Sequence, residues 1–304
     1  MVLCTKRYCL HLFTQHEILP KDKNISAPGR LHEAGYNLRD RHPDYQQFVD
    51  RWQRESDQAR KAPNCQLDLP YGDGPNMTLD IFPAPGTKRP ILIFIHGGYW
   101  RAMGKEDFAY PAIGLNQAGV TYISINYALA PAVTIDEIVE QCRQAVVWVY
   151  RNAEKYGGDA NRIHVSGHSA GGHLTGMMLA TDWAQLGLPP APIVSGTPIS
   201  GVFDLLPILE TSINDDVRLD SDSAVRNSPI TLIPSNGVPI ISAVGGGETN
   251  AFLSQSEAYA EAWKKTGGNA TYMPIEGFHH FDVVCELGRS GSELNNAILA
   301  LIEP

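Results

Sequence analysis

The stretch that decides the fold is "RIHVSGHSAGGHLTGMMLATDW", Arg162–Trp183, in which a β-rich run meets a helical run at a single turn. At that turn, Gly167–Gly171 forms the pattern G-x-S-x-G with Ser169 at its centre. In this pattern a strained turn projects the serine hydroxyl beyond the strand, and the flanking glycines leave room for the crossing backbone. The stretch therefore predicts a serine nucleophile, although the pattern alone also occurs in Gly-rich turns without chemistry.

Around this stretch the chain alternates between β-rich and helical segments. Ile91–Ile95 is a continuous apolar run, which suits a strand buried on both faces. The expected strands are Asn76–Ala84, Arg89–Gly98, Gly119–Leu129, Arg162–His168, Val238–Glu248 and Ala270–Gly277. The expected helices are His42–Lys61, Thr134–Gly157, His173–Trp183, Phe252–Gly267 and Ser292–Glu303. Such alternation predicts an α/β fold with a mostly parallel central sheet covered by helices on both sides.

The chain is expected to consist of an N-terminal extension and one domain that carries a small helical cap. Residues 1–35 show little periodicity and are predicted to be an N-terminal extension, poorly ordered or lying outside the core. Residues 36–304 are expected to form a single domain, because no linker divides them. Within that domain, the helical segment 41–60 and an insert at about 205–230 are candidate elements of a small helical cap.

Composition limits the partners and the location of the protein. Hydrophobic residues make up 43% of the chain and charged residues 19%, and no apolar run is long enough to span a bilayer. The formal net charge of -9, without a cluster of Lys and Arg, argues against nucleic acid as a partner. Five scattered cysteines and the absence of a secretory signal favour reduced thiols and a cytoplasmic protein that acts without a membrane. A homodimer is compatible with the sequence, which leaves the oligomeric state open.

A second Gly-rich motif, "HGGYW" at His96–Trp100, follows the strongest predicted strand. Upstream of a nucleophile turn, this is where a hydrolase places the loop that stabilises an oxyanion. The backbone amides of Gly98 and Tyr99, together with that of Ala170, are the expected donors. The alternative is a Gly-rich turn that only packs against the sheet.

A serine nucleophile requires a base and a carboxylate, which in this fold follow it in the order acid, then histidine. Glu248 follows one predicted strand, and His279 and His280 follow the next. Asp204 is an alternative acid, but a helix-capping role fits it equally well.

Three histidines, His164, His168 and His173, raise the question of a metal site. Their expected places in a strand, a turn and a helix do not bring the side chains together, so no metal is expected.

Together, "HGGYW", "GHSAGG", "SGVFDL", "GGGETNAFLSQS" and "GFHHFD" resemble the kynurenine formamidase (arylformamidase) group of α/β-hydrolases, related to the hormone-sensitive-lipase-like esterases. The resemblance runs from about residue 35 to the end of the chain. It implies Ser169 as nucleophile, Glu248 as acid and His280 as base, with the amides of Gly98 and Tyr99 as oxyanion donors. His280 is implied because it precedes Phe and Asp, as the family histidine does. The acid is often Asp in this family, and here it is Glu.

The resemblance implies a serine hydrolase that works through an acyl-enzyme, with N-formyl-L-kynurenine as substrate and kynurenine and formate as products of tryptophan catabolism. It requires no metal or organic cofactor. Trp100, Phe281 and His168 are candidate substrate contacts, although packing against the sheet is an equal alternative for the aromatic pair. A general short-chain carboxylesterase would use the same catalytic residues, and a non-catalytic ligand-binding protein of this fold is the third alternative.

Overall fold

The computed structural model describes residues 30–235 and 237–303. Its centre is an eight-stranded sheet in the order β1-β2-β4-β3-β5-β6-β7-β8. The strands are β1 (Gln66–Pro70), β2 (Thr78–Phe82), β3 (Arg89–Ile95), β4 (Thr121–Ile125), β5 (Gly158–His168), β6 (Ile193–Ile199), β7 (Ile240–Gly245) and β8 (Ala270–Ile275). Neighbouring strands from β4 to β8 pair in parallel, whereas β2 pairs antiparallel with both β1 and β4. This confirms the predicted α/β fold with a mostly parallel sheet.

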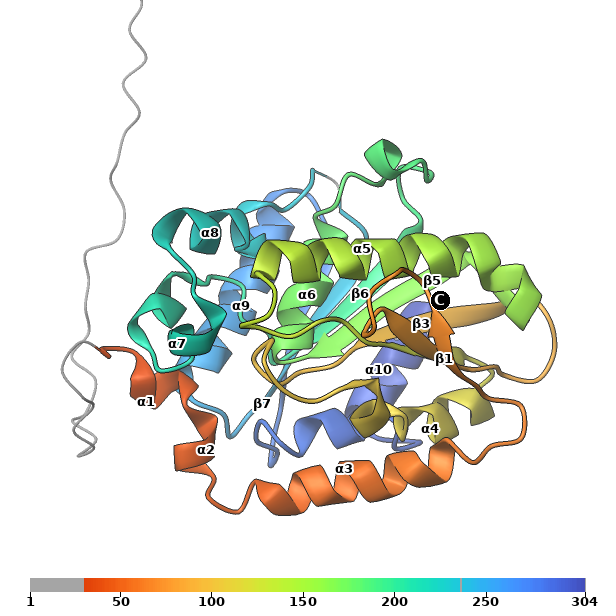
Figure 1. Ribbon diagram of the computed structural model, residues 1–304, viewed down its shortest axis with the longest axis horizontal. Coiled ribbons are helices and arrows are strands. Elements are labelled where there is room, and N and C mark those ends of the chain that lie inside the picture. The colour runs from red at the N-terminus through yellow and green to blue at the C-terminus, as the bar shows by residue number, and fades with distance from the viewer. Residues whose placement is uncertain (1–29, 236, 304) are drawn as a thin grey trace, which may run out of the picture.

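Helices cover both faces of the sheet. In Figure 1, α5 and α6 lie above the strands, and α3, α4 and α10 lie below them. The helices are α1 (Glu33–Tyr36), α2 (Leu38–Arg41), α3 (Gln46–Ala59), α4 (Pro111–Gln117), α5 (Ile135–Asn152), α6 (Ala170–Leu179), α7 (Asn214–Val217), α8 (Ser221–Arg226), α9 (Asn250–Lys265) and α10 (Glu293–Ile302). None of the helices in the described residues is long and apolar enough to cross a membrane.

Strands β3 and β4 could be recognised in the sequence because nearly all of their residues are buried and most are apolar. All residues of β4, and all of β3 after its first residue, are buried, as expected for strands covered on both faces. The elements expected from the sequence include neither β1, nor β6, whose residues Ile193–Ile199 include Ser, Gly, Thr and Pro, nor α4. Strand β1 is an edge strand of only five residues that includes an aspartate and a proline, so its hydrophobic signal is weak.

The segment before the main fold is tied to two distant elements. Helix α1 begins at Glu33, so the expected boundary at residue 35 falls inside a helix, and residues 1–29 of the expected extension lie outside the described residues. The Glu33 carboxylate accepts hydrogen bonds from the Ser212 amide at 2.6 Å and from the Ser212 hydroxyl at 2.5 Å. The Thr249 hydroxyl donates to the Gly35 carbonyl at 2.8 Å. These contacts hold α1 against the insert that contains α7 and against the start of α9, as Figure 1 shows at one end of the molecule.

Helix α3 lies on the opposite face of the sheet from α5 and α6. Contacts in its middle and just past its end hold it in place. In its middle, Trp52 is buried against Phe108, with ring centroids 5.3 Å apart, and its Nε1 donates to Cys285 Sγ at 3.3 Å. Just past its end, Arg60 forms an ion pair with Asp80, which lies on β2 and is fully buried.

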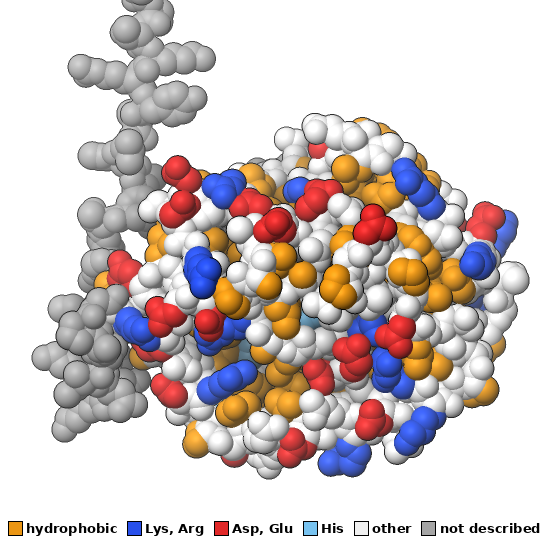
Figure 2. Space-filling model, viewed as in Figure 1, with side chains coloured by type: hydrophobic (Ala, Val, Ile, Leu, Met, Phe, Trp, Pro, Cys, Tyr) orange, Lys and Arg blue, Asp and Glu red, His pale blue; other side chains and the backbone are white. Residues whose placement is uncertain are grey.

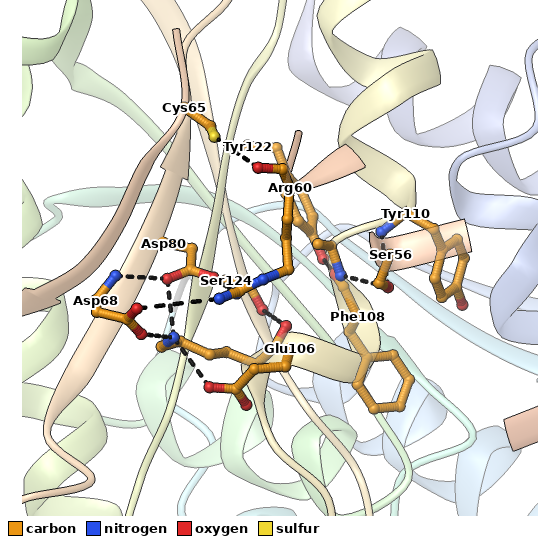
Figure 3. Close-up of polar contacts among 12 residues, drawn as sticks. Ser56, Arg60, Cys65, Asp68, Asp80, Glu106, Phe108, Tyr110, Tyr122 and Ser124 are labelled. Carbon is orange, nitrogen blue, oxygen red and sulfur yellow. Dashed lines mark hydrogen bonds and ion pairs between the residues drawn. The ribbon is translucent and has the colours of Figure 1, made fainter. Parts of the chain in front are cut away.

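Asp80 belongs to an ionic cluster, drawn in Figure 3, in which Asp80 and Lys105 are buried, Arg60 is partly buried, and Asp68 and Glu106 are exposed. Lys105, in the 3₁₀ helix η1 (Lys105–Phe108), is fully buried, and its Nζ lies 2.6 Å from Asp68, 2.8 Å from Asp80 and 3.0 Å from Glu106. Burial alone would lower the pKa of Lys105, but its hydrogen bonds to Asp68 and Asp80 outweigh burial and raise the pKa above its ordinary value. The cluster thus joins the end of α3 to β2 and to the segment that follows the HGGYW loop.

Candidate active site

Ser169 lies at the turn between β5 and α6. Its backbone has φ 59° and ψ -118°, a region that non-glycine residues seldom occupy. The residue is buried, with a relative exposure of 3%. A Cβ at Gly167 would lie 2.3 Å from the Gly171 carbonyl oxygen, and a Cβ at Gly171 would lie 1.9 Å from the Ile95 carbonyl oxygen. The two glycines of the motif are therefore required by the close approach of β3 and α6 to this turn.

His280 and Glu248 form a buried pair beside this turn. His280 Nδ1 donates to Glu248 Oε2 at 2.7 Å. The other carboxylate oxygen, Oε1, accepts from the Gly245 amide at 2.9 Å and from the Ser200 hydroxyl. With Nδ1 engaged, Nε2 is the ring nitrogen left to exchange a proton, and His280 and Ser169 line the same pocket. Glu248 is held from three sides and can orient the imidazole.

The structure separates the two adjacent histidines that the residues alone left open. His279 has its ring centroid 4.3 Å from that of His42, and its Nδ1 accepts from the Phe281 amide at 3.1 Å. It is not among the residues that line the pocket with Ser169. His280 is therefore the histidine that the fold brings to the serine.

Asp204, the alternative acid, lies elsewhere. Its Oδ1 accepts from the Leu206 amide at 3.0 Å, at the start of the 3₁₀ helix η4 (Leu206–Glu210). Asp204 thus closes a turn just before η4, whose N-cap is Leu205, and it does not line the pocket that contains Ser169.

The HGGYW loop lies directly against the nucleophile turn. A Cβ at Gly97 would lie 2.8 Å from the His168 carbonyl oxygen and 3.2 Å from Ser169 Cβ. Gly98, Tyr99 and Trp100 all have positive φ values, of 105°, 48° and 59°. Three consecutive residues in this region turn the backbone sharply, and Ala170 begins α6, whose first N–H groups have no partner within the helix. The arrangement can present backbone N–H groups to an oxyanion.

The remaining histidines near the turn have separate hydrogen-bond partners. His168 Nε2 donates to the His280 carbonyl at 2.9 Å, and His173 Nε2 donates to the Asn227 carbonyl at 2.7 Å. His164 Nδ1 pairs with Ser195 Oγ at 2.6 Å. Burial lowers the pKa of His173 and of His164 to about 4, and burial together with the charge of His280 lowers that of His168 well below its usual range. Within residues 30–235 and 237–303 no group of three His, Cys, Asp or Glu side chains is placed to hold a metal ion.

Of the three candidate substrate contacts, the structure places two in the pocket. His168 and Phe281 line it together with Ser169 and His280. Trp100 does not: its side chain is fully buried, and its Nε1 donates to His173 Nδ1 at 3.1 Å. The expectation that Trp100 contacts substrate is wrong, because the positive φ of Trp100 turns its ring under the loop and onto α6.

Sequence reasoning missed several residues that shape the site. Ser200, whose hydroxyl holds Glu248, lies just after β6 and carries no motif that would single it out. Arg39 and Arg101 line the pocket but come from α2 and from the loop after HGGYW, which only the folded chain brings together. The Tyr99 hydroxyl donates to the Tyr36 carbonyl at 2.6 Å, which connects the HGGYW loop to α1.

Comparisons with known proteins agree with this fold and site. A family model described as BD-FAE matches residues 79–186. Kynurenine formamidase from Salmo salar is 33% identical over 255 residues, which cover 81% of this chain and 85% of the relative. Esterase LipQ from Mycobacterium tuberculosis is 31% identical over 240 residues, covering 71% of this chain and 57% of the relative.

Two solved structures extend the comparison to three dimensions. The crystal structure of a protein from a Silicibacter species is 31% identical and superimposes with a TM-score of 0.79, covering 91% of this chain and 100% of that chain. The hyperthermophilic esterase from Pyrobaculum calidifontis, at 21% identity and a TM-score of 0.68, covers 86% of this chain and 92% of that chain, and shares the fold.

These findings define the protein as a metal-independent hydrolase with the α/β-hydrolase fold. Within that class, the chain belongs to the kynurenine formamidase family.

Proposed function

We propose that the protein is an arylformamidase that hydrolyses N-formyl-L-kynurenine to kynurenine and formate, a step of tryptophan catabolism. The observation that carries the proposal is the pairing of His280 with Glu248 beside Ser169, in a chain that is 33% identical to a kynurenine formamidase. The proposed catalytic residues are Ser169, His280 and Glu248, with the amides of Gly98, Tyr99 and Ala170 as oxyanion donors.

The first half of the reaction transfers the formyl group to the enzyme. Neutral His280 takes the Ser169 proton through Nε2 as the hydroxyl oxygen attacks the formyl carbon. Negative charge then develops on the formyl oxygen, and the loop and α6 amides stabilise it; each such donor typically lowers the barrier by about 2.7 to 4 kcal/mol. His280, now protonated and held by Glu248, gives its proton to the departing aryl amine.

The second half releases formate. Water replaces the amine, His280 removes a proton from the water, and the resulting attack on the formyl-serine regenerates Ser169. The buried Glu248 carboxylate stabilises the imidazolium in both halves, because its two oxygens are fixed by Ser200, Gly245 and His280.

The aromatic wall of the pocket supports an aryl leaving group. Tyr45 and Phe281 have ring centroids 5.7 Å apart, and both line the pocket with Trp52. Such rings offer offset or edge contacts to a substrate ring. A kcat/KM for N-formyl-L-kynurenine far above that for p-nitrophenyl butyrate is the expected result, and a strong preference for butyrate would overturn the formamidase proposal.

A carboxylesterase of the same fold is the second candidate, favoured by the 31% identity to esterase LipQ. It would use the same three catalytic residues. The ratio of kcat/KM for formamide and ester substrates decides between the formamidase and the carboxylesterase. Under both proposals, replacement of Ser169 abolishes hydrolysis.

We propose further that the protein acts in the cytoplasm, without a membrane or nucleic acid, and that residues 36–304 form one domain in which α3 and the 205–230 insert act as a cap. Activity should survive prolonged treatment with EDTA, because every proposed step uses only protein groups and water.

We also propose that the protein forms a homodimer. Sedimentation of the purified chain tests this, and a monomer at working concentration would contradict it.

A further inference from the structure

The pocket that contains Ser169 and His280 has a charge pattern unlike the rest of the molecule. Two arginines, Arg39 and Arg101, line it, and no aspartate or glutamate does so among the residues that the structure describes. The whole chain carries a formal net charge of -9, and Figure 2 shows acidic and basic side chains mixed across the face in view. A cationic pocket in an acidic protein indicates an anionic ligand group.

The first arginine is held rigidly at the pocket wall. Arg101 follows the HGGYW loop, and its Nη1 donates to Asp216 Oδ2 at 2.5 Å. Asp216 is not among the pocket-lining residues, so the ion pair holds the guanidinium without placing a carboxylate in the pocket lining. A guanidinium has five N–H donors, and one hydrogen bond to Asp216 leaves others for a ligand.

The second arginine keeps its charge unpaired within the described part of the chain. Arg39 lies on α2 with its guanidinium carbon 5.1 Å from the centroid of the Tyr45 ring, and it takes part in no ion pair there. Its neighbour Asp40 instead accepts a hydrogen bond from Asn37 at 2.8 Å. Stacking on Tyr45 orients the guanidinium beside the aromatic wall without neutralising it.

We propose that Arg39 and Arg101 form a subsite for a carboxylate on the leaving-group portion of the substrate. The inference rests on the proposed function and deepens it, because N-formyl-L-kynurenine carries such a carboxylate on the chain attached to its aryl ring. The aryl ring would lie against Tyr45 and Phe281, with the carboxylate at the two guanidinium groups. Arginine suits this task because its planar fork matches carboxylate geometry.

The subsite predicts a preference that does not depend on the scissile bond. Each substrate is compared with a partner in which only the carboxylate is changed. In the formamide series, the pair is N-formyl-L-kynurenine and its methyl ester, with release of the aryl amine as the readout. In the ester series, the pair is 3-acetoxybenzoate and phenyl acetate. We expect the carboxylate to raise kcat/KM about tenfold in each series, the scale of a charge-assisted bond at a partly open site.

The variants separate the subsite from general damage to the pocket. Arg39→Ala should lower kcat/KM for the two carboxylates about tenfold, chiefly through KM, and should not lower it for the two partners that lack a carboxylate, the cationic methyl ester and the neutral phenyl acetate. Arg39→Lys should recover part of the loss because it keeps the charge, and Arg39→Glu should exceed the loss of Arg39→Ala. Arg41→Ala is the matched control: it removes the same charge from the same helix, but Arg41 does not line this pocket. Circular dichroism and urea unfolding show whether each variant is folded.

The outcomes are distinct from those of the proposed function. If neither formamide is hydrolysed but 3-acetoxybenzoate is still preferred through Arg39, the formamidase proposal fails and the carboxylate subsite stands. If N-formyl-L-kynurenine is a good substrate but Arg39→Ala lowers kcat/KM equally for substrates with and without the carboxylate, or Arg41→Ala matches its effect, the subsite is wrong and the formamidase proposal stands.

Discussion

Two regions of this molecule bury ionisable side chains in opposite ways. Around Ser169, His168 and His173 are buried with only carbonyl or ring-nitrogen partners, and burial lowers the pKa of each so that both rings are neutral. In the ionic cluster, Lys105 is equally buried, yet three carboxylates raise its pKa and keep it charged. The difference comes from the partners, since desolvation disfavours the charged form in both regions.

The comparison assigns different roles to the two regions. The cluster matches its cations with carboxylates and joins α3, β2 and η1, so its role is to fix the pocket wall relative to the oxyanion loop. The turn region contains one carboxylate, Glu248, and that carboxylate is directed at one histidine, His280. His280 is thus placed to become cationic in the proposed reaction, while burial keeps the nearby His168 and His173 neutral.

The largest expected effect comes from removing the nucleophile from the turn region. Ser169→Ala should lower kcat by about 10⁴- to 10⁶-fold, because the hydroxyl is the group that attacks the substrate. Steady-state release of product measures the loss, and the urea unfolding midpoint should not fall. Activity that survives Ser169→Ala would contradict the site.

The next largest effect tests the cluster. Lys105→Met removes the cation between three carboxylates and leaves fully buried Asp80 with Arg60 as its one cation and the Asp68 amide as a further donor, so the free energy of unfolding should fall by about 3 to 5 kcal/mol. Urea unfolding at pH 7 measures it. Lys264→Met is the matched control, because Lys264 pairs with Glu261 at the surface and its loss should leave the unfolding midpoint unchanged. An equal loss of unfolding free energy in the two variants would contradict the claim that the buried ion pairs stabilise the protein more than the exposed pair does.

Acid should destabilise the protein through its neutral histidines. Burial lowers the pKa of His164 and His173 to about 4, against about 6.5 when unfolded, so the unfolded chain binds more protons between these values. The stabilisation is complete above about pH 6.5 and falls as the pH drops toward about 4, by up to about 1.4 kcal/mol per pH unit for each histidine. His164→Gln should flatten this slope in urea unfolding from pH 7 to 5. An unchanged slope would mean that His164 is not held neutral.

The smallest effect concerns the residue that supports the acid. Ser200 has φ 50° and donates to Glu248, so Ser200→Gly removes the hydroxyl without straining the backbone. We expect kcat to fall about tenfold with KM little changed, because a hydrogen bond to a charged group is lost. Ser242→Ala is the control, since the Ser242 hydroxyl on β7 donates to the Ser256 carbonyl on α9 at 2.9 Å. A similar loss of kcat in both variants would contradict the proposal that Ser200 positions Glu248.

Much of the fold could be predicted because its signals are local. The apolar run Ile91–Ile95 and the turn Gly167–Gly171 each depend on a few adjacent residues, and both lie where the sequence placed them. Edge strand β1 was missed because three of its five residues are exposed and none is buried.

The parts that could not be predicted depend on contacts between distant segments. Trp100 is the last residue of the loop motif, but its side chain is directed to His173 on α6, 73 residues away. Ser200 reaches Glu248 across 48 residues, and Arg60 reaches Asp80 between α3 and β2. Periodicity and motifs describe neighbours along the chain, so they carry no information on such pairs.

The central claim, that the fold activates Ser169 through His280, is tested most directly by labelling with a fluorophosphonate and locating the adduct by mass spectrometry. The account predicts modification at Ser169, a rate reduced at least about a thousandfold in His280→Ala, and a rate close to that of the unmodified protein in His279→Ala. An adduct on another residue, or fast labelling in His280→Ala together with slow labelling in His279→Ala, would contradict it.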